Sequence, residues 1–116
     1  MHELSLCEDL LDQALTIAQQ HQAKYIEALT LIIGPLAGVE PLLLENAFAI
    51  LKIGTLAETA TLIIQSSPVI IVCLVCNQES TVSANHLVCH HCHSNDTQLL
   101  NGAELILANL TLFTTS

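Results

Sequence analysis

Four cysteines arranged in two Cys-x-x-Cys pairs are the residues best suited to do chemistry. The first pair is Cys73 and Cys76, the second is Cys89 and Cys92, and twelve residues separate the pairs. Two such pairs can turn four thiolates toward one point at Zn–S distances of about 2.3 Å. Four protein ligands leave no open coordination position. The spacing therefore predicts a structural zinc site, whose binding energy folds a ribbon too small to bury a core.

Other uses of these cysteines compete with zinc. The segment from Cys89 to His93 matches the Cys-x-x-Cys-His pattern of c-type haem attachment, but haem would leave the first pair without a role. Disulfides need an oxidising compartment, and the chain opens with Met-His-Glu, which lacks the basic start of a signal peptide. A redox dithiol is usually one pair beside a βαβ pattern. A zinc hydrolase would keep an open position on the metal.

The amino terminus offers a second group of metal donors. The Met1 amine, the nearby backbone nitrogens, the His2 imidazole and the Glu3 carboxylate together form an N/O set that suits Ni²⁺ or Cu²⁺. The second residue of a chain is normally frayed and unconstrained. Taken alone, the presence of His2 is therefore also consistent with a residue that has no metal-binding function.

Hydrophobic periodicity indicates the elements that position these groups. Ser5 and Glu8 have capping-box spacing and predict a helix from Ser5 to His21, with Cys7 packed on its apolar stripe. Pro41 suits the first turn of a second helix, which we expect to end before Gly54. Strands are expected over residues 24–33, 59–65 and 104–113. Residues 69–72 are expected to be extended and to lead into the first cysteine pair.

This order of elements predicts an α+β fold, in which two helices cover a three-stranded sheet and a zinc-ribbon domain is inserted. We expect one domain to comprise residues 1–67 plus 98–116, and the zinc ribbon to comprise residues 68–97. A break at Ser66-Ser67-Pro68 supports the first boundary, and a turn at Ser94-Asn95-Asp96 supports the second.

Composition limits the classes of partner. The formal net charge is −9, with only two basic residues, so the surface repels phosphate backbones and nucleic acid is not an expected partner. Hydrophobic residues make up 52% of the chain, and charged residues make up 11%, against about 25% in typical domains. Apolar residues must therefore reach the surface, which favours association with another protein or with a second copy as a homodimer.

No membrane-spanning segment is expected. The long apolar stretch from Leu29 to Gly54 contains Glu40, Glu45 and Lys52, and Gly34-Pro35 interrupts it. Reduced cysteines and the lack of an export signal predict a cytoplasmic location.

Several motifs occur together in one order. Beside the two cysteine pairs, they are Met1-His2-Glu3-Leu4-Ser5, Gly38-Val39-Glu40-Pro41, Gly54-Thr55-Leu56-Ala57-Glu58 and the Gly102–Leu105 segment. This pattern closely resembles the HypA/HybF family of hydrogenase nickel-incorporation proteins over essentially the full chain length. The combination of an N-terminal Met-His-Glu with spaced cysteine pairs is specific.

The resemblance implies a nickel metallochaperone and not an enzyme. It implies that Ni(II) is held at the amino terminus by His2, with Glu3 and backbone nitrogens contributing and Glu40 close enough to supply a further oxygen. It implies structural zinc at the four cysteines. It also implies a HypB-type nickel GTPase and the large subunit of [NiFe]-hydrogenase as partners, with urease served by some members.

One part of the sequence departs from the family pattern. The second cysteine pair usually has Pro and Gly around it, whereas His90, His91 and His93 stand here. These imidazoles are either solvated bystanders or groups that tune the zinc site under acid. The rival class for the whole chain is a zinc-ribbon interaction module without a nickel role.

Overall fold

The computed structural model describes residues 2–115, which form two compact units. Of the described residues, the first unit contains 2–31, 39–65 and 106–115, and the second contains 32–38 and 66–105. The sequence had placed residues 98–105 with the first unit. They belong to the second because β5 (Thr97–Asn101) pairs with β3 (Val69–Cys73), with Ile71 opposite Leu99 and Cys73 opposite Thr97.

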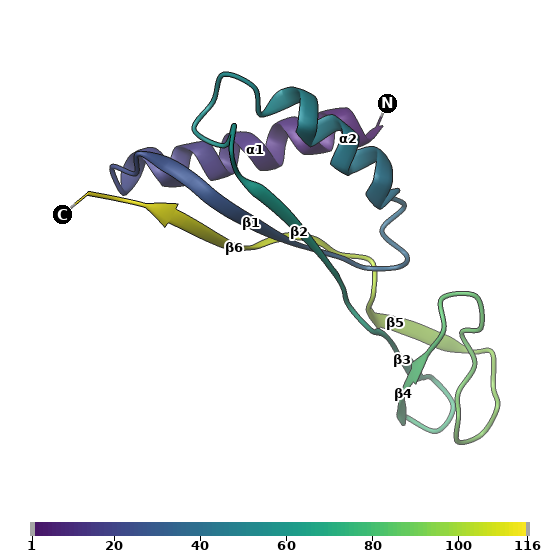
Figure 1. The fold of residues 1–116 in the computed structure, drawn as a ribbon. Helices are drawn as coiled ribbons and strands as arrows, with labels where there is room; N and C mark the ends of the chain where they lie inside the picture. The colour runs from purple at the N-terminus through teal and green to yellow at the C-terminus, as the bar shows by residue number, and fades with distance from the viewer. Residues whose placement is uncertain (1, 116) are drawn as a thin grey trace. The chain divides into compact units, whose positions relative to one another are not determined.

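The first unit is a helix layer on a sheet (Figure 1). Its sheet has the strand order β2-β1-β6, formed by β1 (Tyr25–Ile33), β2 (Thr61–Ser66) and β6 (Leu105–Phe113). The helices α1 (His2–Gln20) and α2 (Pro41–Leu51) pack against each other on one face of that sheet. This confirms the predicted α+β arrangement and all three strands of the predicted sheet.

Both helices bury the stripe that the sequence indicated. Cys7 is buried, as predicted. The other buried side chains of these elements are Leu10, Leu11, Ala14 and Ala18 of α1, Ile26, Leu29, Leu31 and Ile33 of β1, and Leu44, Ala47 and Phe48 of α2.

The first helix begins earlier than the sequence indicated. α1 starts at His2, so Ser5 lies within the helix and its capping-box spacing with Glu8 does not mark the start. The backbone of His2 and Glu3 is helical. Helix-forming residues from His2 onward explain this, since no Pro or Gly interrupts the first turn.

The second helix begins as predicted at Pro41. Glu40 is its N-cap residue, with an extended backbone and a carboxylate oxygen that accepts from the Leu42 N–H at 3.4 Å. The helix ends at Leu51 with Lys52 as the C-cap, so Gly54, with φ of +80°, lies in the turn that follows and not directly at the stop.

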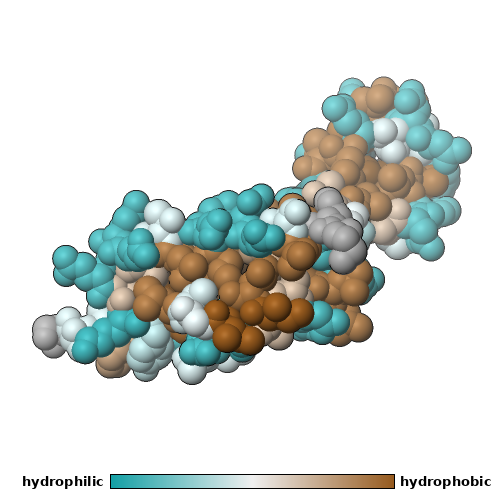
Figure 2. Space-filling model, turned by 90° about the horizontal axis from the view of Figure 1, so that it is seen from above, coloured by the Kyte–Doolittle hydropathy of each residue, from teal (hydrophilic) through white to brown (hydrophobic). Residues whose placement is uncertain are grey.

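The outer surface of α2 is unusually apolar. Leu42, Leu43, Ile50 and Ile53, on α2 and the turn after it, are each at least half exposed. Figure 2 views the molecule from the helix side, and hydrophobic atoms form a continuous area on the first unit between rows of hydrophilic side chains. Part of the high hydrophobic content of the chain, 52% of its residues, therefore lies on the exposed surface of α2.

The second unit is a three-stranded antiparallel sheet carrying the cysteine loops. β3 lies between β4 (Glu79–Val82) and β5, with Val69 opposite Val82 and Ile71 opposite Ser80. The sequence predicted the extended segment before the first cysteine pair but not the two strands beside it. Val69, Ile71 and Cys73 are buried, so this small sheet has its own core next to the cysteines.

Candidate metal centres

The four predicted zinc ligands meet at one end of the second unit. β3 ends at Cys73, and a tight turn brings Cys76 back beside it. Asn77 closes this turn with φ of 63° and donates its N–H to the Cys73 carbonyl. The second pair repeats the same geometry, because His93 has φ of 64° and donates its N–H to the Cys89 carbonyl.

The sulfur positions fit a tetrahedral zinc ion. All four Sγ atoms lie within 4.8 Å of one another. Cys73 Sγ lies 3.4 Å from Cys92 Sγ, and Cys76 Sγ lies 3.6 Å from Cys89 Sγ. Four sulfurs at about 2.3 Å from zinc would be about 3.8 Å apart, which is close to these separations. The four cysteines form a zinc-ribbon-like site that supplies all four ligands of a tetrahedral ion.

Backbone amides prepare two of the sulfurs to carry negative charge. Cys73 Sγ accepts from the amides of Val75 and Cys76 at 3.3 and 3.4 Å. Cys89 Sγ accepts from the amides of His91 and Cys92 at the same two distances. Hydrogen bonds to a thiolate stabilise the ionised form. The two pairs therefore hold the site in a nearly symmetric way.

The pKa values follow from these contacts. The amide of Cys76 lowers the pKa of Cys73 below its ordinary value. The amide of Cys92, followed by that of His91, lowers the pKa of Cys89 to about 6. The pKa of Cys92 rises to about 12, because the neighbouring Cys73 sulfur and burial outweigh the opposing hydrogen bond from Ser94. The close sulfur contacts join Cys73 to Cys92 and Cys76 to Cys89. Without a metal, one thiol of each contact thus ionises before the other. A divalent cation is needed to hold four thiolates together.

The histidines near the second pair do not join this group. Among the residues that the structure describes, the metal-ligating cluster contains only the four cysteines. His90, His91 and His93 are all exposed. Their backbones have structural roles, including the His90 N–H that donates to Ser80 Oγ at 3.2 Å. Tuning of the zinc site by these imidazoles stays a prediction.

Ser80 is a supporting residue that the sequence did not reveal. It is the only polar residue among those that are buried in the described chain, and it ties β4 to the second cysteine loop through His90. A single serine between Glu79 and Thr81 gives no local signal of this role. Its importance depends on a contact between residues ten positions apart.

The amino-terminal candidates lie in the first unit. Met1 and the side chain of His2 lie outside the described residues, so the structure places only the backbone of His2, at the start of α1. Glu3 follows in the first turn. The Glu40 N–H donates to Glu3 Oε2 at 3.1 Å, so the structure brings Glu3 and Glu40 together.

Comparison with known proteins extends this picture to the whole chain. Residues 1–112 match the model of a family described as hydrogenase/urease nickel incorporation, metallochaperone, HypA. The chain belongs to the HypA family. The four-cysteine cluster and the fold are therefore those of a nickel-incorporation metallochaperone with a zinc-type site.

HypA relatives from two organisms match this chain over nearly its full length. The hydrogenase maturation factor HypA of Nitrosospira multiformis is 42% identical over 115 residues, which span 99% of this chain and all of the relative. The HypA of Aquifex aeolicus is 38% identical over 97% of each chain. The match thus includes both the amino-terminal residues and the cysteine pairs.

HypA folds solved in solution agree with this structure. The Ni metallochaperone HypA from Helicobacter pylori superposes with a TM-score of 0.72 at 25% identity, covering 97% of this chain and 98% of the other. A second HypA solution structure gives a TM-score of 0.75 at 26% identity and 97% coverage of each chain. In this HypA-family chain, no helix of the described residues has the length and hydropathy needed to cross a bilayer.

Proposed function

We propose that this protein binds Ni(II) at its amino terminus and delivers it for the maturation of [NiFe]-hydrogenase. His2 is the central ligand, and Glu3, the Met1 amine and backbone nitrogens complete the set, with Glu40 as a further oxygen donor. Zinc at Cys73, Cys76, Cys89 and Cys92 is structural. The protein is a carrier and catalyses no reaction.

The observation that carries this proposal is the meeting of two helix starts. α1 begins at His2, α2 begins at Pro41, and the hydrogen bond from Glu40 to Glu3 joins their first turns. Carboxylates are favoured at helix N-termini, so two oxygen donors are concentrated where the chain begins. Glu3 follows His2 directly in sequence, and its hydrogen bond with Glu40 supports a ligand set that contains both carboxylates.

The start of a helix is also where backbone nitrogens can bind a metal without disturbing the helix hydrogen bonds. The first four N–H groups of an α-helix have no carbonyl partner within the helix. A backbone nitrogen must lose its proton to bind nickel. At His2 and Glu3 this loss breaks no hydrogen bond of the helix ladder, whereas the same step in the middle of α1 would. Imidazole, amide nitrogen and carboxylate form a donor set that suits Ni²⁺.

Delivery requires a partner that docks near this site. We propose a HypB-type nickel GTPase and the hydrogenase large subunit as those partners, with urease maturation as a further use. The exposed apolar side chains of Leu42 and Leu43 lie in the first turn of α2, just after Glu40 and Pro41, so a partner bound to α2 would lie close to the cargo. We propose that the protein acts in the cytoplasm, because its reducing conditions keep the cysteine ligands as thiolates.

The test is a nickel titration of untagged, zinc-loaded protein with its native Met1. We expect wild type to bind about one Ni²⁺ and His2→Ala to lose tight binding, while both retain about one zinc and the same melting temperature. His21→Ala is the matched control, because His21 lies just beyond the other end of α1, where its ring Nδ1 hydrogen-bonds the Ile17 carbonyl at 2.9 Å. Equal nickel binding by His2→Ala and wild type would favour the zinc-ribbon interaction module without a nickel role.

The same titration should depend on pH. The imidazole, the amine and any bound backbone nitrogen must lose protons before they bind the metal, so nickel affinity should fall as pH decreases. Calorimetry in buffers with different ionisation enthalpies measures the protons released. Release of no protons would mean that nickel binds elsewhere, through groups already deprotonated.

A further inference from the structure

Three passages of the chain meet at one place within the second unit. They are residues 34–37, which lead toward α2, residues 67–69, which lead into β3, and residues 101–104, which lead into β6. The Gly34 N–H donates to the Glu104 carbonyl at 2.8 Å, and the Leu36 N–H donates to the Gly102 carbonyl at 2.7 Å. The segment before α2 is therefore bonded to the segment before β6, although the whole cysteine-bearing part of the chain separates them in sequence.

The side chain of Glu104 fastens this meeting point. Its Oε1 accepts from the Gly102 N–H at 2.8 Å, so Gly102 donates to Glu104 and accepts from Leu36 at the same time. The Glu104 N–H, followed by the Ser67 hydroxyl and the Gly102 N–H, lowers the pKa of this carboxyl below its ordinary value. The side chain is therefore ionised at neutral pH, and an ionised acceptor forms stronger hydrogen bonds than a neutral one.

The backbone segments approach each other closely here. Gly34 and Gly102 are buried, and a Cβ at Gly34 would overlap the Gly102 carbonyl. A Cβ at Gly102 would lie 3.1 Å from the Val69 Cα, and the φ of +127° at Gly102 favours glycine. Loss of the Glu104 acceptor would leave the buried Gly102 N–H without a partner, which costs more than the hydrogen bond itself contributes.

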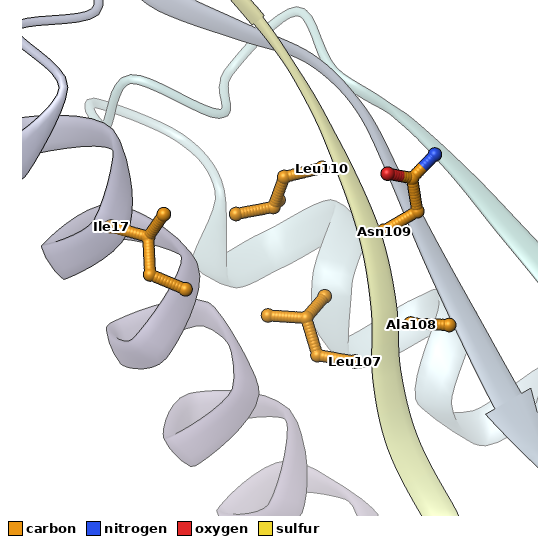
Figure 3. A pocket seen from close by; sticks show the side chains of 5 residues that line it. All are labelled: Ile17, Leu107, Ala108, Asn109 and Leu110. Atoms are coloured by element: carbon orange, nitrogen blue, oxygen red, sulfur yellow. The ribbon is translucent and has the colours of Figure 1, made fainter.

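Two of the three passages are held by strands. β3 pairs with β4 and β5, and β6 pairs with β1. Figure 3 shows Leu107 and Leu110 of β6 directed toward Ile17 of α1. Residues 34–37 form a turn instead, and the hydrogen bonds to residues 102 and 104 hold this turn in place.

The turn leads to a proposed nickel donor. Gly38, which has φ of +73°, and Val39 connect it to Glu40, the N-cap residue of α2. The Glu40 N–H donates to Glu3 Oε2 at 3.1 Å, so this short connection is fixed at both ends. Release of the turn would free one end and would let residues 34–39 sample more conformations.

We propose that Glu104 is a positioning residue for the nickel site, because it holds the turn that sets the path of the chain into Glu40. This inference rests on the proposed function, in which Glu40 supplies an oxygen to Ni(II). The effect passes along the chain and needs no contact between the two units. When the Glu104 carboxylate is lost, part of the nickel binding energy must order residues 34–39 again, and nickel affinity falls.

Hydrogen exchange of the zinc-loaded, nickel-free chain tests the hold on the turn. Glu104→Ala removes the acceptor, and we expect the amides of Gly34 and Leu36 to exchange about tenfold faster than in wild type. Glu104→Gln keeps an oxygen acceptor without the charge and should lie between the two. Glu79→Ala is the matched control, since it removes the same charge from an exposed position on β4 of the same unit and should leave both amides unchanged.

A double-mutant cycle tests whether Glu104 acts through Glu40. We expect Glu104→Ala to raise the nickel Kd by about threefold or more, with the zinc content unchanged. In a Glu40→Gln background the same substitution should have no further effect, because the carboxylate that it positions is already gone. A role of Glu104 in stability alone would leave nickel affinity unchanged or would weaken it equally in both backgrounds.

Three results would overturn the proposal. They are wild-type exchange of Gly34 and Leu36 in Glu104→Ala, wild-type nickel affinity in that variant, and an equal loss of affinity in both backgrounds. Failure of the proposed function is distinguishable, because His2→Ala would then bind nickel as wild type does while the exchange of the turn still responds to Glu104→Ala. Should Glu104→Ala lose its zinc, the cycle is run with Glu104→Gln, which should weaken nickel binding less and only where Glu40 is present.

Discussion

The Glu40 N–H donates a hydrogen bond to Glu3 Oε2 at 3.1 Å, which joins two residues 37 positions apart in the sequence. Glu40 is at the same time the N-cap residue of α2, and its own carboxylate accepts from Leu42. The two glutamates thus belong to one hydrogen-bonded group at the starts of both helices. A contact made for helix capping also assembles the proposed oxygen donors for nickel.

Replacement of Glu3 should separate these two roles. Glu3→Ala removes the acceptor, and we expect the free energy of unfolding to fall by about 1 kcal/mol. Glu3→Gln keeps an oxygen acceptor but loses the charge, so it should be closer to wild type in stability and still bind nickel more weakly. Urea denaturation and nickel calorimetry measure the two effects. Glu8→Ala, on the same helix, is the control, and wild-type nickel affinity in Glu3→Gln would remove the carboxylate from the ligand set.

Loss of one zinc ligand should unfold only the second unit. Cys76→Ser leaves three thiolates, and we expect the zinc content to fall from about one per chain to near zero. The second unit has few buried side chains besides its cysteines, so its amide NMR signals should collapse to random-coil positions. Signals of α1, α2 and β1 should persist, because their core lies in the first unit. Cys7→Ala should keep its zinc, and a fully ordered Cys76→Ser protein without metal would refute the structural role.

Cys7 should be the unreactive cysteine of the chain. Burial, with a smaller effect of the Glu8 charge, raises the pKa of the Cys7 thiol to about 11. The thiolate is the nucleophile, so alkylation by iodoacetamide at pH 8 should be much slower in folded than in urea-unfolded protein. Rapid labelling of Cys7 in the folded, zinc-loaded protein would show that α1 opens readily.

The same shift predicts a pH dependence of stability. The folded-state pKa of Cys7 lies above the ordinary value of 9.0, so the folded chain binds more protons between these two values. Stability should therefore decrease as pH rises from about 9 toward 11. Other groups titrate in this range, and the difference between wild type and Cys7→Ala isolates the thiol. No difference between pH 8 and pH 10 would contradict the shift.

Gly34 should tolerate no side chain. A Cβ at this position would overlap the carbonyl group of Gly102, and the same segment carries the hydrogen bond from the Gly34 N–H to the Glu104 carbonyl. We expect Gly34→Ala to lower the unfolding free energy by about 2 kcal/mol or more, because both contacting atoms are backbone. Gly38→Ala is the comparison. Open space surrounds Gly38, but its φ is +73°, so the cost should be about 1 kcal/mol. Equal costs in thermal or urea unfolding would contradict the close approach.

Sequence alone was sufficient for the parts of this protein that are encoded locally. The spacing of Cys73, Cys76, Cys89 and Cys92 predicted their convergence, because a Cys-x-x-Cys turn directs both sulfurs to one side. Pro41 marked the start of α2, since its fixed φ suits the first turn of a helix. The three strands of the larger sheet were visible as apolar and β-branched runs between turn residues.

Tertiary structure alone decided the features that depend on distant backbone partners. The contact of Glu3 with Glu40 and the start of α1 at His2 could not be read from Ser5 and Glu8, whose capping spacing was equally good. Residues 97–101 have no alternating pattern, and they became β5 only because β3 offered an edge to pair with. The open edge of β6 exists for the same reason: a hydrophobic pattern predicts a strand, whereas the order of strands in a sheet depends on long-range hydrogen bonds that no local pattern encodes.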